Sequence, residues 1–210
     1  MIRRSVAASP YKLLSVLFRY PDAALVEARE ELLREIASLP KSRAKRSLVE
    51  FHGYLEGSSP VKLAQTYVET FDLRRRTSLY LTYYLHGDTR KRGMALLRLR
   101  RLYKSAGLEP ATGELPDYLP LMLEFAALAP DGFGETLLIE HRPALELLRS
   151  GLHDRGNPYG YLLDALTATL PRLTPRERAR VRQLAAEGPP SEQVGLEPFA
   201  PPEVMPEARA

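Results

Sequence analysis

A capping residue followed directly by proline recurs along the chain, and this pairing restricts the fold more than any other feature. The pairs are Ser9-Pro10, Ser59-Pro60, Asn157-Pro158 and Thr174-Pro175. Proline is favoured at the first position of a helix, where its missing N–H leaves nothing unpaired, and Ser, Thr and Asn are good N-caps. Thr174 also precedes Glu177 by three residues, which is the spacing of a capping box. Each pair therefore predicts the start of a helix.

Between these starts, apolar residues recur at helical spacing. Leu occurs 37 times and Val and Ile together 12 times, a bias that favours helix over sheet. We find no internal repeat and no convincing pairing of strands. The predicted fold class is therefore all-α, a single-domain helical bundle of about nine or ten helices. The expected helices span residues 10–20, 22–39, 42–56, 60–71, 77–86, 90–106, 118–128, 133–150 with a break at Arg142-Pro143, 158–170 and 175–187.

Length and composition predict one domain with a tail. The chain has 210 residues, of which 44 % are apolar, enough to bury a sizeable core. Six of the 23 residues from Gly188 onward are proline, so we expect a helical domain over 1–187 and a flexible tail over 188–210. The absence of Cys excludes disulfides and thiolate metal sites.

The sequence predicts a cytoplasmic protein without stable membrane insertion. No apolar run approaches the roughly 20 residues that span a bilayer. The first residues carry two arginines but no apolar core before Pro10, so we do not expect a secretory leader.

The turn His86-Gly87-Asp88-Thr89 joins two segments with helical periodicity. Gly87 can adopt the positive φ that ends a helix, and Asp88 or Thr89 can cap the next one. We assign a structural turn to Gly87, Asp88 and Gly93, which serve backbone geometry and not phosphate binding.

A second segment, Glu114-Leu115-Pro116-Asp117-Tyr118-Leu119-Pro120, leads into another helix. Residues before proline are held out of the α region, so this chain is stiff and extended. Asp117 is a suitable N-cap for the helix that follows.

Charge is segregated along the middle of the chain. Residues 74–104 hold ten Lys/Arg and one acid, Asp88, whereas residues 108–146 hold eight Asp/Glu and one basic residue, Arg142. One interpretation is two solvated helix faces of opposite sign that touch. The other is a positive and a negative rim around a shared cleft, which would orient a charged peptide. Arg90 and Arg92 oppose the helix dipole in a first turn, so we expect Asp88 or acids of 114–124 to hold them.

Catalytic and metal sites find no support in the sequence. The four histidines do not form a metal-ligand spacing, no glycine-rich phosphate loop is present, and no Ser/His/Asp order suggests a hydrolase. The aromatic residues of 67–84 follow helical spacing, which is more typical of a core than of a site. If they are buried, their hydroxyls need partners, for which Asp72 and Asp117 are candidates. Asp72 itself is expected to cap a helix, to pair with 74–76 or to line a cleft, and His86 to pack at a helix end or to contact a ligand.

Three segments in order resemble the NarJ family, the nitrate reductase molybdenum cofactor assembly chaperones, within the wider TorD/DmsD-like group. They are YVETFD at 67–72, HGDTRKRGMAL at 86–96 and ELPDYLPLMLEF at 114–125. The clear similarity covers about the middle third of the chain, and the helical layout matches more loosely from Pro10 to about Leu170.

The resemblance implies an all-helical cytoplasmic chaperone for nitrate reductase assembly, with no enzyme activity and no cofactor of its own. It would bind the N-terminal peptide of the catalytic (alpha) subunit of a respiratory nitrate reductase, hold that subunit for molybdenum cofactor insertion, and delay membrane docking. The family peptide is amphipathic and basic. Because no pterin pocket is visible in the sequence, we expect the cofactor to arrive with other proteins, molybdenum cofactor biosynthesis proteins among them.

The residues that the resemblance and the patterns together nominate for the client peptide lie in the three matching segments. On this basis, Asp117→Lys should weaken peptide binding and leave the fold intact. The alternative function is a helical scaffold or nucleic-acid-binding adaptor that uses the basic 74–104 face. The nominated residues are Tyr67, Phe71, Asp72, Tyr83, His86, Arg90, Leu115, Pro116, Asp117, Tyr118, Met122 and Glu124.

Overall fold

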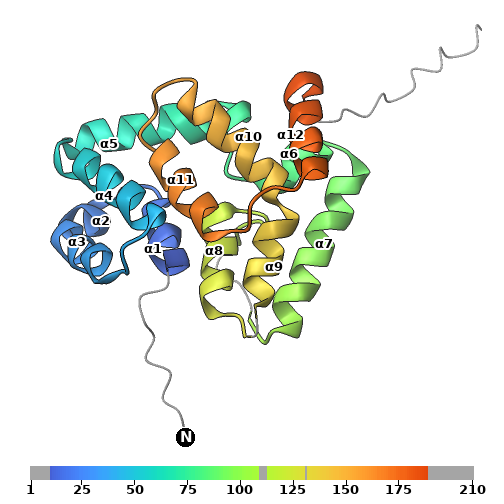
Figure 1. Cartoon of the computed structure of the whole chain (residues 1–210), viewed down its shortest axis with the longest axis horizontal. Coiled ribbons are helices and arrows are strands. Elements are labelled where there is room, and N and C mark those ends of the chain that lie inside the picture. Colours follow the sequence, from blue (N-terminus) through green and yellow to red (C-terminus); the bar gives the residue numbers. More distant parts are fainter. Residues whose placement is uncertain (1–9, 109–112, 131, 189–210) are drawn as a thin grey trace, which may run out of the picture.

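Helices make up most of the described chain in the computed structural model, which describes residues 10–108, 113–130 and 132–188 (Figure 1). Ten of the twelve described α-helices have seven or more residues, which confirms the predicted all-α class. A π-helix, Val68–Asp72, and a 3-10 helix, Arg75–Thr77, join α5 to α6. The α-helices are α1 (Pro10–Leu17), α2 (Ala23–Glu27), α3 (Arg29–Ser38), α4 (Arg43–Glu56), α5 (Pro60–Tyr67), α6 (Leu81–His86), α7 (Arg90–Ser105), α8 (Leu119–Leu128), α9 (Phe133–Glu140), α10 (Arg142–His153), α11 (Gly160–Thr169) and α12 (Pro175–Glu187).

Side-chain caps account for several of these starts. The Ser59 side chain accepts a hydrogen bond from the backbone N–H of Lys62, and Thr174 and Glu177 form the complete capping box at α12. Asn157 acts differently. Its Oδ1 accepts from the N–H of Tyr159, and α11 begins at Gly160. The predicted start at Ser9-Pro10 is described only from Pro10, because Ser9 lies outside the described residues.

Three expected helices are interrupted. The segment 22–39 divides into α2 and α3 at Ala28, whose N–H donates to the carbonyl of Ala24. The segment 60–71 changes from α to π geometry after Tyr67. The segment 133–150 breaks at His141, one residue before the expected position, and Pro143 takes a place in the first turn of α10.

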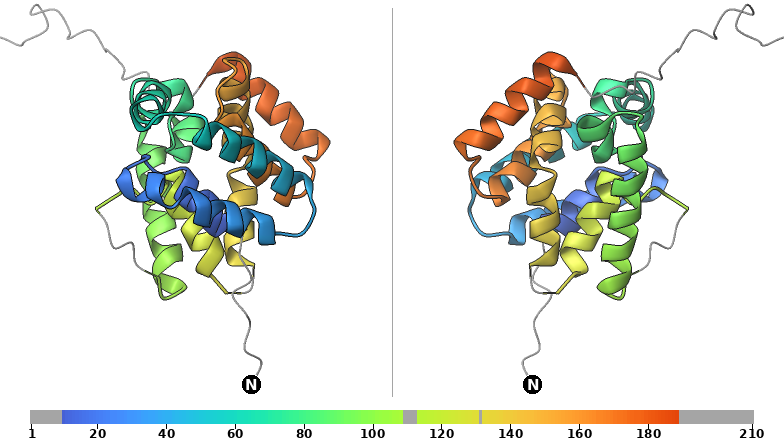
Figure 2. Two further views of the ribbon diagram at one scale, coloured as in Figure 1. Left: turned by 90° about the vertical axis from the view of Figure 1, so that its left-hand side faces the viewer. Right: turned by 90° about the vertical axis from the view of Figure 1, so that its right-hand side faces the viewer.

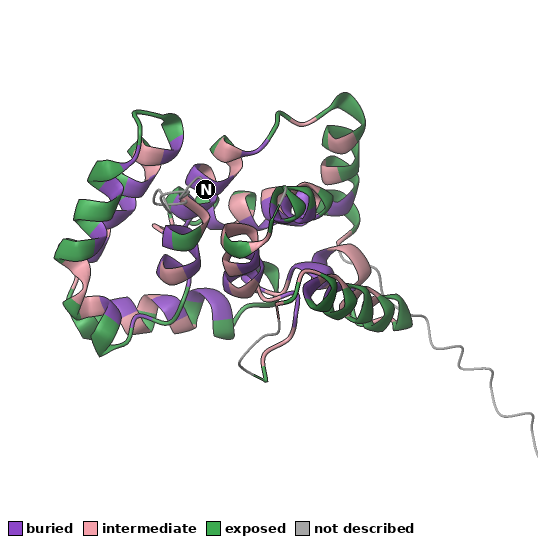
Figure 3. Ribbon diagram, turned by 90° about the horizontal axis from the view of Figure 1, so that it is seen from below, coloured by how far each residue is buried: buried purple, intermediate pink, exposed green. Residues whose placement is uncertain are grey.

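The helices pack around a core that consists largely of leucine. α1 lies against α8 and α11, α4 against α11 and α3, and α10 against α6, α11 and α12 (Figures 1 and 2). Leu14, Leu48, Leu123 and Leu163 are fully buried, each on a different helix. Figure 3 shows that α12 is mostly exposed, and only its Leu184 is buried. Among the described residues, no helix is both long and apolar enough to cross a membrane.

Candidate functional site

A short antiparallel contact joins the matching segment 114–125 to the residues at the start of α6. The N–H of Leu81 donates to the carbonyl of Asp117 over 3.1 Å, and the N–H of Leu119 donates to the carbonyl of Leu79 over 2.8 Å. These two bonds surround a single bridge between Tyr80 and Tyr118. The start of α6 is therefore fixed beside the start of α8.

Asp117 closes this junction from inside the protein. Its side chain is completely buried, and Oδ2 accepts hydrogen bonds from the N–H of Thr82 at 3.2 Å and from the Thr82 hydroxyl at 2.5 Å. The expected N-cap of α8 thus caps α6 instead, and Tyr118 takes the N-cap position of α8 without a side-chain bond. Because Asp117 is not exposed on a rim, the expectation that Asp117→Lys leaves the fold intact is wrong: the variant would bury a cation among the donors that now serve a carboxylate.

Arg92, in the matching segment 86–96, joins the first turn of α7 to the same junction. Its guanidinium lies 3.2 Å from Asp88 and 3.9 Å from Asp117, and its Nε donates to the Thr82 hydroxyl over 3.3 Å. The predicted carboxylate partners of this first-turn cation are therefore confirmed. The guanidinium carbon also lies 5.9 Å from the centre of the Tyr83 ring, within the range of a cation–π contact.

Three buried tyrosines, Tyr67, Tyr84 and Tyr103, donate to backbone carbonyls. Tyr67 donates to the carbonyl of Phe18 at 3.2 Å and shares a second hydrogen bond with the hydroxyl of Tyr118, and Tyr103 donates to the carbonyl of Pro116 at 2.6 Å. Burial raises the pKa of the Tyr67 hydroxyl, so it remains a donor. The expectation that Asp72 and Asp117 accept from these hydroxyls is wrong.

A groove of about 440 Å³ opens above this junction, between the end of the π-helix, α6 and the first turn of α7. Tyr80 and Tyr83 line it as half-buried rings, and Phe71 contributes a ring edge that is 7 % exposed. The carboxylate of Asp72 is exposed there and makes no hydrogen bond or ion pair with another described residue. We call this site the Asp72 groove; its lining is Phe71, Asp72, Arg74, Arg75, Ser78, Tyr80, Tyr83, Asp88 and Arg92.

Only some of the residues nominated for the client peptide line the groove. Phe71, Asp72, Tyr83 and the turn residue Asp88 line it, whereas Tyr67, Pro116, Asp117 and Met122 are buried beneath or away from it. Leu115 and Tyr118 are half-buried and Arg90 is exposed, and none of the three lines the groove. The lining arginines and Tyr80 were not nominated, although the basic run that directly follows YVETFD could have indicated the arginines.

The acidic rim expected from 114–124 does not form. Glu124 pairs instead with Lys12 at 2.6 Å and Arg19 at 3.1 Å, and these cations lower the pKa of its carboxyl. Glu114 accepts a hydrogen bond from the Tyr80 hydroxyl at 2.8 Å, so it supports a lining residue from behind. The two oppositely charged segments touch directly, as in the pair between Arg98 and Glu140 at 3.1 Å. The acids of the groove are Asp72 and Asp88.

The turn before α7 has the geometry that a glycine allows. Gly87 ends α6 with a φ of 56°, and its N–H donates to the carbonyl of Tyr83 over 2.7 Å. A side chain is strained at this φ. Gly93 does not belong to the turn, because it lies inside α7. Burial, with Lys91 and Arg180 nearby, lowers the pKa of His86, which lies at the end of α6 and outside the lining of the groove.

These features define an all-α protein with an open groove that aromatic and charged side chains line. No described set of three or more His, Asp or Glu side chains could hold a metal. The sequence model of the nitrate reductase delta subunit family matches residues 38–164. The chain therefore belongs to the nitrate reductase delta subunit family, which includes the NarJ chaperones.

Relatives of known name agree with this assignment. The probable nitrate reductase molybdenum cofactor assembly chaperone NarJ of Bacillus subtilis is 34 % identical over 80 % of this chain and 91 % of its own length. NarJ of Escherichia coli K12 is 38 % identical over 73 % of this chain and 66 % of its own length. The nitrate reductase-like protein NarX of Mycobacterium tuberculosis is 37 % identical over 76 % of this chain, but the match spans only 24 % of that longer protein.

Proposed function

We propose that this protein is a cytoplasmic chaperone that binds the N-terminal peptide of the catalytic subunit of a respiratory nitrate reductase. Binding would keep that subunit competent for molybdenum cofactor insertion and would delay its docking at the membrane. Molybdenum cofactor biosynthesis proteins would then act as further partners on the held subunit. The names of the relatives support the assembly role, and the Asp72 groove is the observation that carries the peptide-binding part of the proposal.

The groove suits an amphipathic, basic peptide segment. Two half-buried tyrosine rings give an apolar floor, and the exposed carboxylate of Asp72 stands beside them without a described partner. Arg92 is already paired with Asp88 and Asp117, so its charge is largely balanced within the protein, whereas Arg74 and Arg75, which also line the groove, have no acidic partner among the described residues. An apolar face of the peptide would pack on the rings, and a basic residue of the peptide would approach Asp72.

The energies fit reversible binding. A side chain that becomes fully buried gains about 1.5–3 kcal/mol, so two or three anchors supply about 3–9 kcal/mol. Association and peptide ordering oppose this with about 4–15 kcal/mol. An exposed ion pair to Asp72 adds only about 0.2–1 kcal/mol. Weak, reversible binding is what a chaperone needs, because its client must leave after assembly.

Titration calorimetry with the client's N-terminal peptide tests the proposal. Asp72→Lys replaces the groove's free carboxylate by a cation and should weaken binding about fivefold, the equivalent of about 1 kcal/mol, because the pair is lost and a like charge takes its place. Glu35→Lys is the matched control, because Glu35 is also an exposed acid but lies on α3. Equal affinities of wild type, Asp72→Lys and Glu35→Lys would remove the groove from the peptide site.

A further inference from the structure

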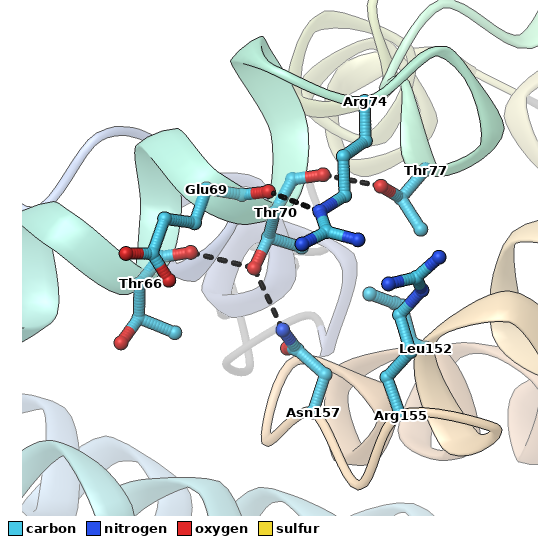
Figure 4. Close-up of a pocket in the computed structure, with 8 residues that line it drawn as sticks. All are labelled: Thr66, Glu69, Thr70, Arg74, Thr77, Leu152, Arg155 and Asn157. Carbon is cyan, nitrogen blue, oxygen red and sulfur yellow. Dashed lines mark hydrogen bonds between the residues drawn. The ribbon is translucent and has the colours of Figure 1, made fainter.

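A second, smaller pocket lies on the other side of Arg74 from the Asp72 groove. It measures about 250 Å³ and is enclosed by the end of α5, the π-helix, the 3-10 helix and the turn between α10 and α11. Figure 4 shows its lining: Thr66, Glu69, Thr70, Arg74, Thr77, Leu152, Arg155 and Asn157. Its volume is below the range of about 300–1,000 Å³ that is typical for drug-sized ligands, so its ligand is small.

Hydrogen bonds hold the neutral part of this wall in place. Asn157 Nδ2 donates to the Thr70 hydroxyl at 2.6 Å, and that hydroxyl donates to the carbonyl of Thr66 at 2.5 Å. The hydroxyl of Thr77 donates to the carbonyl of Thr70. Thr70 and Thr77 are buried, so the pocket has a floor that is built before any ligand arrives. π-helical turns such as the one that carries Thr70 occur frequently at functional sites.

Two guanidinium groups complete the pocket without an acid between them. Nε of Arg74 donates to the backbone carbonyl of Glu69 at 3.0 Å, and its two terminal amino groups have no partner among the described residues. The Arg155 guanidinium makes no hydrogen bond or ion pair within the described part of the chain, and only its backbone N–H is bonded, to the carbonyl of Leu152. In Figure 4 the Glu69 carboxylate is turned toward Thr66, away from both guanidinium groups. Two like charges that line one pocket repel each other, and an anion between them removes that repulsion.

We infer that this pocket binds a small oxyanion of the phosphate class, either free phosphate or the phosphoryl end of a small molecule. Guanidinium groups that approach from two separate elements offer planar sets of donors, which suit a tetrahedral dianion better than a single carboxylate. Arg74 and Arg155 supply the charge, and the Asn157–Thr70 pair fixes the shape of the wall.

The pocket and the Asp72 groove share Arg74. A bound anion would keep the Arg74 guanidinium on the pocket side and reduce the positive potential at the groove. That potential otherwise repels a basic peptide. Phosphate would therefore strengthen peptide binding, and the peptide would strengthen phosphate binding by the same factor. This consequence rests on the proposed function, whereas the anion site does not, because phosphate binding can be measured without peptide.

Calorimetric titration of the full chain at constant ionic strength tests the anion site. The ligands are inorganic phosphate, glycerol phosphate and acetate. We expect saturable binding of phosphate, and Arg155→Gln and Arg74→Gln should each weaken it about tenfold or more, since a charge-assisted contact is lost. Arg101→Gln, an exposed arginine on α7, is the matched control and should bind as wild type does.

The three ligands also separate the sources of the anion. If glycerol phosphate binds as tightly as phosphate, the pocket accepts the phosphoryl group of a larger molecule. If phosphate binds and glycerol phosphate does not, the pocket accepts only the free ion. Acetate bound as tightly as phosphate would overturn the ligand class. Phosphate affinity that is equal in wild type, Arg155→Gln and Arg101→Gln would overturn the site.

Discussion

At the scale of single residues, Asp72 and Asp117 show how burial decides the role of a carboxylate. Both belong to segments that the sequence nominates for peptide binding, but Asp72 is exposed in the groove and Asp117 is fully buried beneath it. Composition and spacing do not distinguish them, because the difference arises from the pairing of residues 79–81 with 117–119. The groove is therefore only partly predictable from sequence: Glu114 and Asp117, which support it, lie in a matching segment, whereas their partners Tyr80 and Thr82 do not.

Asp117→Asn should destabilise the protein by about 1–3 kcal/mol. The amide keeps the shape of the carboxylate, and its oxygen can still accept from the N–H and hydroxyl of Thr82. Its NH2 group then takes the place of Oδ1, which is buried and has no partner among the described residues, and the charge opposite Arg92 is lost. Asp88→Asn removes the other partner of the same guanidinium at a side chain that is 64 % exposed, and should change stability by less than about 0.5 kcal/mol. Urea unfolding of the two variants measures both effects, and an equal loss in both would contradict this account.

His141 predicts a pH dependence of stability. Burial lowers its pKa below the ordinary value of 6.5, and its Nδ1 lies 2.9 Å from the carbonyl of Leu137. Below about pH 6.5 the unfolded chain therefore binds a proton that the folded chain does not, so stability falls as pH decreases through this window. The loss approaches at most about 1.4 kcal/mol per pH unit for one proton.

His141→Gln should reduce that slope, because the glutamine does not titrate. Urea unfolding at several pH values between 7.5 and 5 measures the slope in both proteins. His86 contributes in the same direction, since its pKa is also lowered, so a residual slope is expected in the variant. An unchanged slope in His141→Gln would show that other groups dominate.

At the scale of elements, the helix starts were predictable because their cause is local. A capping side chain and a proline act within one turn, and the capping box of α12 forms as the sequence predicts. The π-helix after Tyr67 was not predictable in this way. The Thr70 hydroxyl receives a hydrogen bond from Asn157, 87 residues further along the chain, so tertiary contacts contribute to the geometry there.

Two helical glycines give a matched test of packing between elements. A Cβ on Gly134 would stand 2.2 Å from the Cα of Ala126, so α9 can approach α8 only through a glycine. A Cβ on Gly93 would meet nothing within 4 Å. Gly134→Ala should therefore destabilise the protein by more than about 2 kcal/mol, and Gly93→Ala should stabilise it by about 0.5–1 kcal/mol through helix propensity. Thermal unfolding of both variants checks the signs, and a tolerated Gly134→Ala would contradict the close packing.

At the scale of the whole molecule, charge distinguishes a peptide-binding chaperone from a nucleic-acid adaptor. The chain carries a net charge of +4 and an arginine-rich α7, which the sequence alone leaves open to either function. Structure reduces the free charge of this face, since Arg92 pairs with Asp88 and Asp117, and Arg98 pairs with Glu140. These pairs join residues up to 42 positions apart, so the sequence alone does not show which cations of 74–104 are balanced by acids.

The two functions respond to salt in different ways. At long range a basic peptide is repelled by the net positive charge of the protein, and at short range it is attracted by the unpaired carboxylate of Asp72. Salt screens both interactions over about 10 Å at ~0.1 M. The opposing changes partly cancel, so peptide affinity should vary less than about fivefold between ~50 and ~200 mM salt, and the association rate should not fall. Nucleic acid held by six to ten phosphate contacts would lose about 10³–10⁵ in affinity over the same range. Parallel titrations with the client peptide and with a duplex oligonucleotide decide between the two functions. Tight oligonucleotide binding that is lost as salt increases, together with no peptide binding, would favour the adaptor. Such a loss requires the release of many counterions, which only an uncompensated basic surface produces.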